Sequence, residues 1–325
     1  MRSSFLKALQ NEEHDHTPVW YMRQAGRFLP EYRMVRERVG IYDLCSSPEL
    51  AASISYDAAR ILQTDAAIIF SDIAIPMENL GYSISYREGM GPVMEKTSDE
   101  IHPAISKAGN AIKHFKLSHG DMPILGFVGG PLTIFSYLND SPARDIPNTR
   151  KRIYSWDSET VGMLISIRNM LENEISLQIE AGADAIQVFD SWLGYLEPEF
   201  AGKIVDMMVK PLFRKIKSRG SRGIYFSTMT SGMVDILLKS YADFISLDWR
   251  IDLKTLKERD VGIQGNLDPY LLLYSPEVAR KRAMEIVDSM KERNNYIFNL
   301  GHGILPGTDP QSVINITKTV KSVKI

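Results

Sequence analysis

Short apolar runs recur along the chain, and longer stretches with helical spacing separate them. Eight of these runs predict β-strands: Pro18–Met22, Ala66–Ser71, Ile124–Gly129, Ala185–Asp190, Gly223–Ser227, Phe244–Trp249, Val261–Gly265 and Tyr296–Gly301. Apolar residues three and four positions apart predict amphipathic helices between them. The clearest are Thr160–Ala181, Phe200–Lys217 and Pro276–Arg293.

Strands that alternate with helices predict an α/β fold with a parallel sheet and right-handed crossovers. Several runs are apolar almost throughout, which is typical of strands buried on both faces. We therefore expect one domain over residues 1–325, a (β/α)8 TIM-type barrel with its active-site cleft at the C-terminal ends of the strands. The longer connections, such as Gly81–Asp99, would decorate that barrel.

Composition sets limits on the partners of this chain. Its 325 residues are 44% hydrophobic and 24% charged, with a formal net charge of −2. That balance gives no global attraction to nucleic acid or to a membrane surface. A site for an anionic ligand must therefore be a local cluster of cations.

Cys45 is the one cysteine, so an intrachain disulfide and a zinc site of several thiolates are excluded. The first residues include acids and have no apolar core of signal-peptide length. No apolar run approaches the roughly 20 residues of a membrane span. These features predict a reducing, cytoplasmic location. His14 and His16 flank Asp15 and could touch a metal, but we expect them to be solvated.

Polar groups and small residues follow most of the predicted strands, at the end where a barrel carries its chemistry. The segments are Arg23-Gln24-Ala25-Gly26-Arg27, Ser71-Asp72-Ile73, Gly129-Gly130-Pro131 with Tyr137 beyond it, Asp190-Ser191-Trp192, Asp248-Trp249-Arg250, Gly265-Asn266-Leu267-Asp268-Pro269 and Gly301-His302-Gly303. Ordinary loops are polar as well. The repetition at successive strands favours a binding cleft.

The two arginines after the first strand admit two interpretations. Arg23 and Arg27 could be surface ion-pair partners of little energetic value. They also follow a buried strand directly, with Ala25 and Gly26 leaving space between them. Guanidinium stays charged at any working pH and binds carboxylate through a two-pronged fork, so the pair is suited to a bulky anion.

Asp72 is a lone carboxylate in a largely apolar segment. It could cap a helix or form a structural ion pair. At the mouth of an apolar cleft it would hold N–H donors or stabilise a developing cation. His302 between two glycines could be a turn residue, or an imidazole that binds carboxylate or moves a proton. Tyr137 and Ser191 add neutral hydrogen-bonding groups.

Several familiar motifs are missing from the sequence. It has no Gly-x-Gly-x-x-Gly opening a helix after a strand, no phosphate-binding Gly-Lys-Ser/Thr loop and no Gly-x-Ser-x-Gly turn. Dinucleotide binding, nucleotide hydrolysis and acyl hydrolysis therefore lack support.

Blocks along almost the whole chain resemble the uroporphyrinogen decarboxylase family. They are PVWYMRQAGRFLPEYR, FSDIAIP, GGPLTIFSYL, IQVFDSWLGYL, ISLDW, GNLDP and NLGHGILPGTDP, in family order from near residue 17 to near residue 310. The resemblance implies a (β/α)8 barrel that forms a homodimer with facing clefts. It also implies decarboxylation of the four acetate arms of uroporphyrinogen III to give coproporphyrinogen III, with no cofactor and no metal.

Matching motifs carry the family's site residues onto this sequence. The resemblance implies that Arg23, Gln24, Ala25, Gly26 and Arg27 form the substrate-gripping loop and that Asp72 lies at the centre of the bound macrocycle. It makes Tyr137, Ser191 and His302 the remaining polar contacts. Catalytic roles would fall to Asp72, Arg23, Tyr137 and His302. Trp192 departs from members that have histidine there, which affects only the outer lining.

Two other functions remain open at this point. A cobamide-dependent methyltransferase on a related barrel would hold zinc through histidine and cysteines, whereas Gly265-Asn266 here has no His-x-Cys beside it. A tetrapyrrole carrier would bind without releasing carbon dioxide. Zinc analysis and an assay for carbon dioxide distinguish these functions from a decarboxylase.

Overall fold

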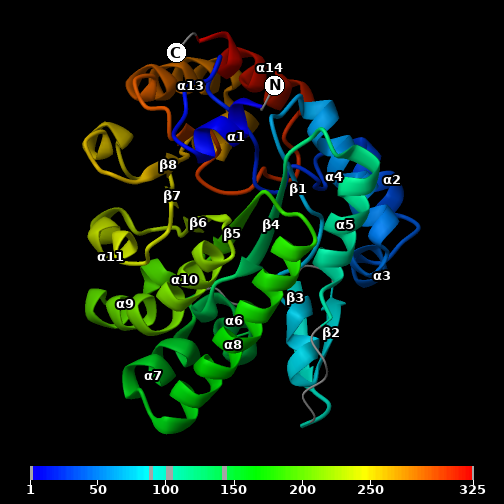
Figure 1. Ribbon diagram of the computed structural model, residues 1–325, viewed down its shortest axis with the longest axis vertical. Coiled ribbons are helices and arrows are strands. Elements are labelled where there is room, and N and C mark those ends of the chain that lie inside the picture. Colours follow the sequence, from blue (N-terminus) through cyan, green and yellow to red (C-terminus); the bar gives the residue numbers. More distant parts are fainter. Residues whose placement is uncertain (1–2, 88–90, 100–104, 141–144, 324–325) are drawn as a thin grey trace.

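The protein, described here from a computed structural model, has a mixed α/β fold built on a curled, seven-stranded parallel sheet. The structure describes residues 3–87, 91–99, 105–140 and 145–323. Figure 1 shows the sheet bending round on itself, with helices along its outer side. Strand order follows chain order, as crossover connections of one hand require.

The sheet runs in the order β1-β4-β5-β6-β7-β8-β9. Its strands are β1 (Ala67–Ile68), β4 (Ile124–Gly129), β5 (Ala185–Phe189), β6 (Arg222–Phe226), β7 (Phe244–Ser246), β8 (Gly262–Gln264) and β9 (Tyr296–Ile297). Seven of the eight predicted strands are confirmed in position, although most are shorter than predicted. The longest ladder, β4 with β5, pairs Leu125 with Ala185 through to Gly129 with Phe189.

Helices connect the strands. They are α1 (Ser4–Leu9), α2 (Pro30–Arg36), α3 (Ile41–Ser46), α4 (Pro48–Leu62), α5 (Lys107–His119), α6 (Pro131–Asn139), α7 (Pro147–Ser155), α8 (Ser158–Glu180), α9 (Pro198–Ile204), α10 (Lys210–Ser218), α11 (Val234–Leu238), α12 (Pro269–Tyr274), α13 (Pro276–Met290) and α14 (Pro310–Ser322). Proline opens many of them, where its missing N–H costs nothing. Capping carboxylates are also common: Asp157 accepts from Thr160 N at 2.8 Å to start α8.

The prediction of one helix over Phe200–Lys217 was wrong in detail. A π-helical turn, η3 (Val205–Val209), separates α9 from α10. Pro211 lies in the first turn of α10 and lacks the N–H that an unbroken α-helix would use. The spacing of apolar residues alone does not distinguish a π-helical turn from an α-helical one.

The first predicted strand, Pro18–Met22, is reduced to a single parallel bridge between Val19 and Phe298. Phe298 N donates to Pro18 O at 2.9 Å, and Asp65 N donates to Val19 O at 2.8 Å. The segment therefore lies between β9 on one side and the residues that lead into β1 on the other.

An antiparallel hairpin was not predicted. β2 (Tyr82–Arg87) pairs with β3 (Gly91–Lys96) in the connection that we expected to be irregular decoration. Between β1 and this hairpin runs a 3₁₀ helix, η1 (Ile75–Leu80). The hairpin projects away from the sheet beside η1 and α6 (Figure 1).

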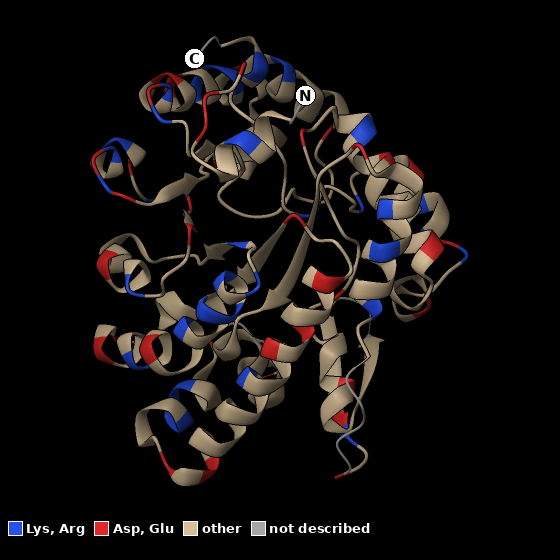
Figure 2. Ribbon diagram, in the orientation of Figure 1, with Lys and Arg blue, Asp and Glu red and all other residues tan. Residues whose placement is uncertain are grey.

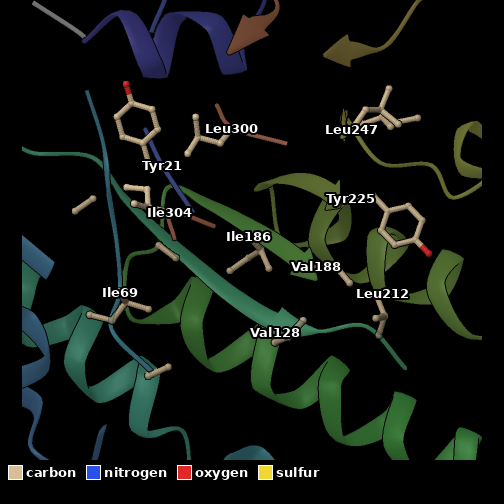
Figure 3. Packing of buried hydrophobic residues seen from close by; sticks show 14 of the residues in the cluster. Tyr21, Ile69, Val128, Ile186, Val188, Leu212, Tyr225, Leu247, Leu300 and Ile304 are labelled. Carbon is tan, nitrogen blue, oxygen red and sulfur yellow. The ribbon is translucent and has the colours of Figure 1, made fainter. Parts of the chain in front are cut away.

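Apolar side chains pack on both faces of the sheet. Residues pointing outward, such as Val128, Ile186 and Val188, pack against the surrounding helices, and Figure 3 shows part of this outer cluster. A smaller inner cluster fills the concave side: Phe5, Ala8, Leu9, Trp20, Met22, Ala66, Ile68, Leu125, Ala185, Ile224, Phe226, Phe244 and Ile297. Helix α1 contributes Phe5, Ala8 and Leu9 to the inner cluster and so closes one end of the curled sheet.

Three fully buried polar side chains and the indole N–H of Trp20 form a hydrogen-bonded network within the inner cluster. Gln264 Nε2 donates to Gln187 Oε1 at 3.0 Å and to Ser246 Oγ at 2.8 Å, and Trp20 Nε1 donates to Gln264 Oε1 at 2.9 Å. Because buried polar atoms are costly without partners, this network fixes how the strands face one another.

Charged residues lie mainly on the helices and loops, and the strands are largely uncharged (Figure 2). Within the described ranges, every helix is too short or too polar to cross a bilayer.

Candidate active site

Arg23 begins the loop that follows the Pro18–Met22 segment. Its backbone is left-handed, with φ +59°, and its side chain is exposed. Gly303 lies directly against this side chain, because a Cβ atom at Gly303 would come 2.5 Å from Arg23 Cδ. Ile304 N also donates to Met22 O at 3.0 Å. The loops that carry Arg23 and His302 are therefore packed together.

The rest of the predicted gripping loop is arranged unevenly. Ala25 and Gly26 are half-buried and Arg27 is exposed. Gln24 is fully buried: its amide accepts from Tyr21 N at 3.3 Å and donates to Ala66 O at 3.4 Å. Its side chain therefore holds the loop against the buried residues Tyr21 and Ala66. A direct role for Gln24 in substrate binding stays a prediction.

Arg33 holds the far end of this loop. Its Nη1 donates to Arg27 O at 2.8 Å and to Phe28 O at 3.0 Å. The third arginine of the opening motif thus has a structural task, because it binds backbone carbonyls of the loop.

Asp72 follows β1 and is half-buried. Its Oδ1 accepts from Ala74 N at 2.8 Å, which fixes the carboxylate at the start of η1. Burial raises the pKa of Asp72, while the Ala74 N–H and the positive charge of Arg23 act to lower it. The group is therefore an electrostatically costly carboxylate that a donor-rich ligand would stabilise.

Tyr86 of the hairpin lies beside Asp72. Burial and the Asp72 charge both raise the pKa of the Tyr86 phenol, and the phenol in turn lowers the pKa of Asp72. The hydroxyl is buried and has no well-formed hydrogen bond to any described residue. The sequence analysis missed Tyr86, because the hairpin that delivers it was not predicted.

Tyr137 lies on α6, half-buried. Burial and the nearby Asp72 charge raise the pKa of its phenol, and Arg23 acts in the opposite direction. Asp190 fixes the start of α6: its Oδ1 accepts from Thr133 N at 3.1 Å and from Thr133 Oγ1 at 2.9 Å. Gly130 allows this approach, since a Cβ atom there would overlap the Asp190 carboxyl group.

Ser191 follows β5 and is half-buried, and its carbonyl accepts from Thr228 Oγ1 at 2.8 Å. Trp192 is next, with its ring edge-on to Tyr195 at 5.0 Å between centroids. Among the described residues, no side-chain contact joins Ser191 or Arg27 to Asp72. Their site roles remain predictions.

His302 is half-buried after β9. Its Nδ1 lies 2.8 Å from Gly303 O, so in the neutral ring Nδ1 carries the proton and Nε2 is an acceptor. Burial lowers the pKa of His302, and the charges of Arg23 and Arg250 lower it further, against the Gly303 carbonyl and Asp268.

Four of the predicted residues lie near one another: Arg23, Asp72, Tyr137 and His302. The charge of Arg23 affects the pKa of each of the other three, and the Arg23 side chain lies against Gly303, next to His302. They come from four separate loops and helices at one edge of the sheet. Below them lie aromatic rings at the ends of β4, β5 and β6. Phe189 contacts Phe127 and Phe226 edge-on, with 5.6 Å between centroids in each pair.

The sequence had a signal for this aromatic floor. Phe127, Phe189 and Phe226 each occupy the inward-facing register of a strand close to its carboxyl end. A count of inward positions along the predicted strands would have found them.

The histidines of the N-terminal segment are not solvated as expected. His16 Nε2 lies 2.8 Å from Asp65 Oδ1, and His14 Nε2 lies 2.9 Å from Asn294 O. Both therefore anchor the segment to the sheet. Within the described ranges, no group of three or more His, Cys, Asp or Glu side chains is placed to hold a metal ion.

A curled parallel sheet with charged and polar side chains near the carboxyl ends of its strands is typical of an α/β enzyme. The family model described as uroporphyrinogen decarboxylase matches residues 1–323. A relative from Picrophilus torridus named uroporphyrinogen decarboxylase is 40% identical, with 98% of each chain covered. One of the same name from Thermoplasma acidophilum is 37% identical over 99% of each chain.

The chain belongs to the uroporphyrinogen decarboxylase family, whose members are carboxy-lyases.

Solved structures support the fold alone. A methyltransferase from Methanosarcina mazei superposes with a TM-score of 0.74 at 19% identity, covering 98% of each chain. A B12-independent methionine synthase from Shewanella sp. W3-18-1 gives 0.62 at 13% identity, covering 86% of this chain and 88% of that one.

Proposed function

We propose that this chain decarboxylates the four acetate side chains of uroporphyrinogen III to methyl groups and releases coproporphyrinogen III, without a cofactor or metal. The observation that carries this proposal is the group formed by Arg23, Tyr137, His302 and the half-buried carboxylate of Asp72. Family membership over residues 1–323 supports the substrate.

The chemistry of the substrate fits this cluster. A porphyrinogen is a flexible tetrapyrrole with four pyrrole N–H donors at its centre and eight carboxylates at its rim. Asp72 would accept the N–H groups, and the exposed guanidinium groups of Arg23 and Arg27 would bind rim carboxylates. Ala25 and Gly26 would leave room for the ring, and Ser191 would complete the polar lining.

Direct loss of carbon dioxide from an acetate arm would leave an unstabilised carbanion. We infer that protonation of the pyrrole α-carbon next to the carbon bearing that arm comes first and makes the ring able to accept the bonding electrons. Carbon dioxide then leaves to give an exocyclic methylene, and protonation of that methylene gives methyl. Loss of the proton first added to the α-carbon restores the pyrrole, so each arm takes up one net proton. Ionised Asp72 would stabilise the cationic ring, an effect of about 3–4 kcal/mol for one well-placed group.

Arg23, or a water that it positions, is the proposed proton donor, and His302 or a water near Tyr137 is its competitor. The neutral His302 ring gives its one N–H to the Gly303 carbonyl. It then has only an acceptor nitrogen left for the cleft, which favours Arg23 or its water.

Asp72→Asn tests the proposal. We expect kcat/KM for uroporphyrinogen to fall by about 10²–10³ while the protein stays folded, because the neutral amide cannot stabilise a cationic ring. Since Asp72 must be ionised and its pKa is raised, wild-type activity should be lost as pH falls through that raised pKa. Asp57→Asn, which changes a half-exposed carboxylate on α4, is the matched control. Normal turnover by Asp72→Asn would remove Asp72 from the mechanism.

Finer features of the architecture belong to the same proposal. The Val19 segment lies between β9 and the approach to β1, which supports a closed barrel of eight strand positions in one domain over residues 1–325. We also propose a cytoplasmic homodimer with facing clefts. Sedimentation velocity at several concentrations tests the assembly, and a monomer throughout would contradict it.

A further inference from the structure

Arg250 follows β7 and is held in place from two sides. Its Nη1 donates to Asp248 Oδ2 at 2.6 Å, and its guanidinium carbon lies 4.6 Å from the centroid of the Trp249 ring. The side chain nevertheless remains 43% exposed. An arginine fixed along one edge and stacked on an aromatic face loses little freedom when a ligand binds to its open edge.

Asp248 does not need this guanidinium to satisfy its buried carboxylate. Its Oδ2 accepts from Met229 N at 2.7 Å, and its Oδ1 accepts from Arg250 N at 3.0 Å. Within the described ranges, Nε and Nη2 of Arg250 make no hydrogen bond. The arrangement therefore leaves two donors of the fork open to solvent.

The open guanidinium belongs to the same edge of the sheet as the site. The Trp249 ring that carries it packs edge-on against the His302 ring, with 5.3 Å between centroids. Gly301 allows this contact, because a Cβ atom there would come 2.6 Å from Trp249 Cε3. Arg250 is thus linked to His302 through Trp249, while the Arg23 side chain lies against the neighbouring Gly303.

We propose that Arg250 is a further substrate-binding residue, which binds a rim carboxylate of the tetrapyrrole beside Trp249 and His302. This inference rests on the proposed function. Eight carboxylates exceed what Arg23 and Arg27 can neutralise, and a third preorganised fork on a different strand-end loop would help to fix the rotation of the ring. Arg250 binds without touching the reacting atoms, so its removal should change affinity more than turnover.

The experiment compares Arg250→Gln and Arg250→Lys with Arg259→Gln, an exposed arginine paired to Asp235. For Arg250→Gln we expect KM for uroporphyrinogen to rise about tenfold with kcat within about twofold of wild type, the size of one lost charge-assisted pair. Affinity for uroporphyrin, measured by fluorescence quenching, should fall by the same factor. Arg259→Gln should match wild type in both measurements.

Arg250→Lys keeps the positive charge beside Asp248 and decides the question if the glutamine variant fails to fold. A KM about threefold above wild type supports loss of the fork. Wild-type KM and uroporphyrin affinity in a folded Arg250 variant would overturn the inference, as would a fall in kcat alone. If wild type binds uroporphyrin but releases no carbon dioxide, the proposed function fails and the binding measurements still judge Arg250.

Discussion

Asp190 shows how one buried residue can prepare a site without touching its ligand. Its carboxylate is fully buried, binds Thr133 at the start of α6 and accepts from Tyr225 Oη at 3.0 Å. Burial raises its pKa from the usual 3.8 to about 6, although these donors act to lower it. The residue therefore positions the helix that carries Tyr137, at a cost to stability when it is ionised.

That cost predicts a pH dependence of stability. A carboxyl with a raised folded-state pKa binds more protons when folded, so its contribution to stability falls as pH rises from about 4 to about 6. The difference amounts to about 3 kcal/mol at neutral pH. Urea unfolding of wild type and Asp190→Asn between pH 4 and 7 measures it. Wild type should gain stability relative to the variant as pH falls, and parallel curves would contradict this.

At the residue scale, strand ends and polar residues within apolar segments led from the sequence to Arg23, Asp72, Tyr137 and His302 as site candidates, and their roles remain predictions. It could not assign the direction of side chains in a loop. Gln24 lies between exposed Arg23 and half-buried Ala25, yet its amide turns into the core. The backbone of Arg23 is left-handed at this change of direction, and residue preferences do not predict that conformation for arginine.

At the scale of elements, α1 is only six residues long, yet it contributes several side chains to the inner cluster. Ser3 caps it by accepting from Leu6 N at 3.3 Å, and Phe5 and Leu9 project into the inner cluster. The helix is too short to be stable alone, so its order comes from this burial.

Phe5→Ala should therefore lower the free energy of unfolding by about 3–5 kcal/mol, because it leaves a cavity in the inner cluster. Glu13→Ala, at an exposed position of the same terminal segment, should change it by less than about 0.5 kcal/mol. Chemical denaturation of both variants provides the measurement. A small loss for Phe5→Ala would mean that α1 detaches readily from the sheet.

Periodicity predicted the order of the elements better than their ends. β4 has the predicted bounds because Ile124–Gly129 pairs on both sides, whereas Pro18–Met22 forms only one bridge. The β2–β3 hairpin escaped prediction because its register depends on the pairing of its two strands with each other, which no strong apolar alternation marks in the sequence. It nevertheless supplies Tyr86 to the site.

At the scale of the whole molecule, a net charge of −2 contrasts with the cations gathered at one edge of the sheet. If Arg23, Arg27 and Arg250 capture a polyanion there, salt should weaken binding more than catalysis. We expect KM for uroporphyrinogen to rise severalfold between about 50 and 300 mM sodium chloride, with little change in kcat. Sucrose at equal osmolality is the control. A KM that does not change with salt concentration would contradict an electrostatic contribution to binding.

The filled interior of the curled sheet also limits the routes by which small molecules can reach or leave the site. Trp20, Gln187, Ser246 and Gln264 form a fully buried hydrogen-bonded layer, and Phe5 lies in the apolar cluster beside it. In the part of the chain that the structure describes, this layer blocks any tunnel along the axis. We therefore expect carbon dioxide to leave, and protons to arrive, on the same side of the sheet where the substrate binds. Each turnover would then require the bound ring to leave a gap at its rim.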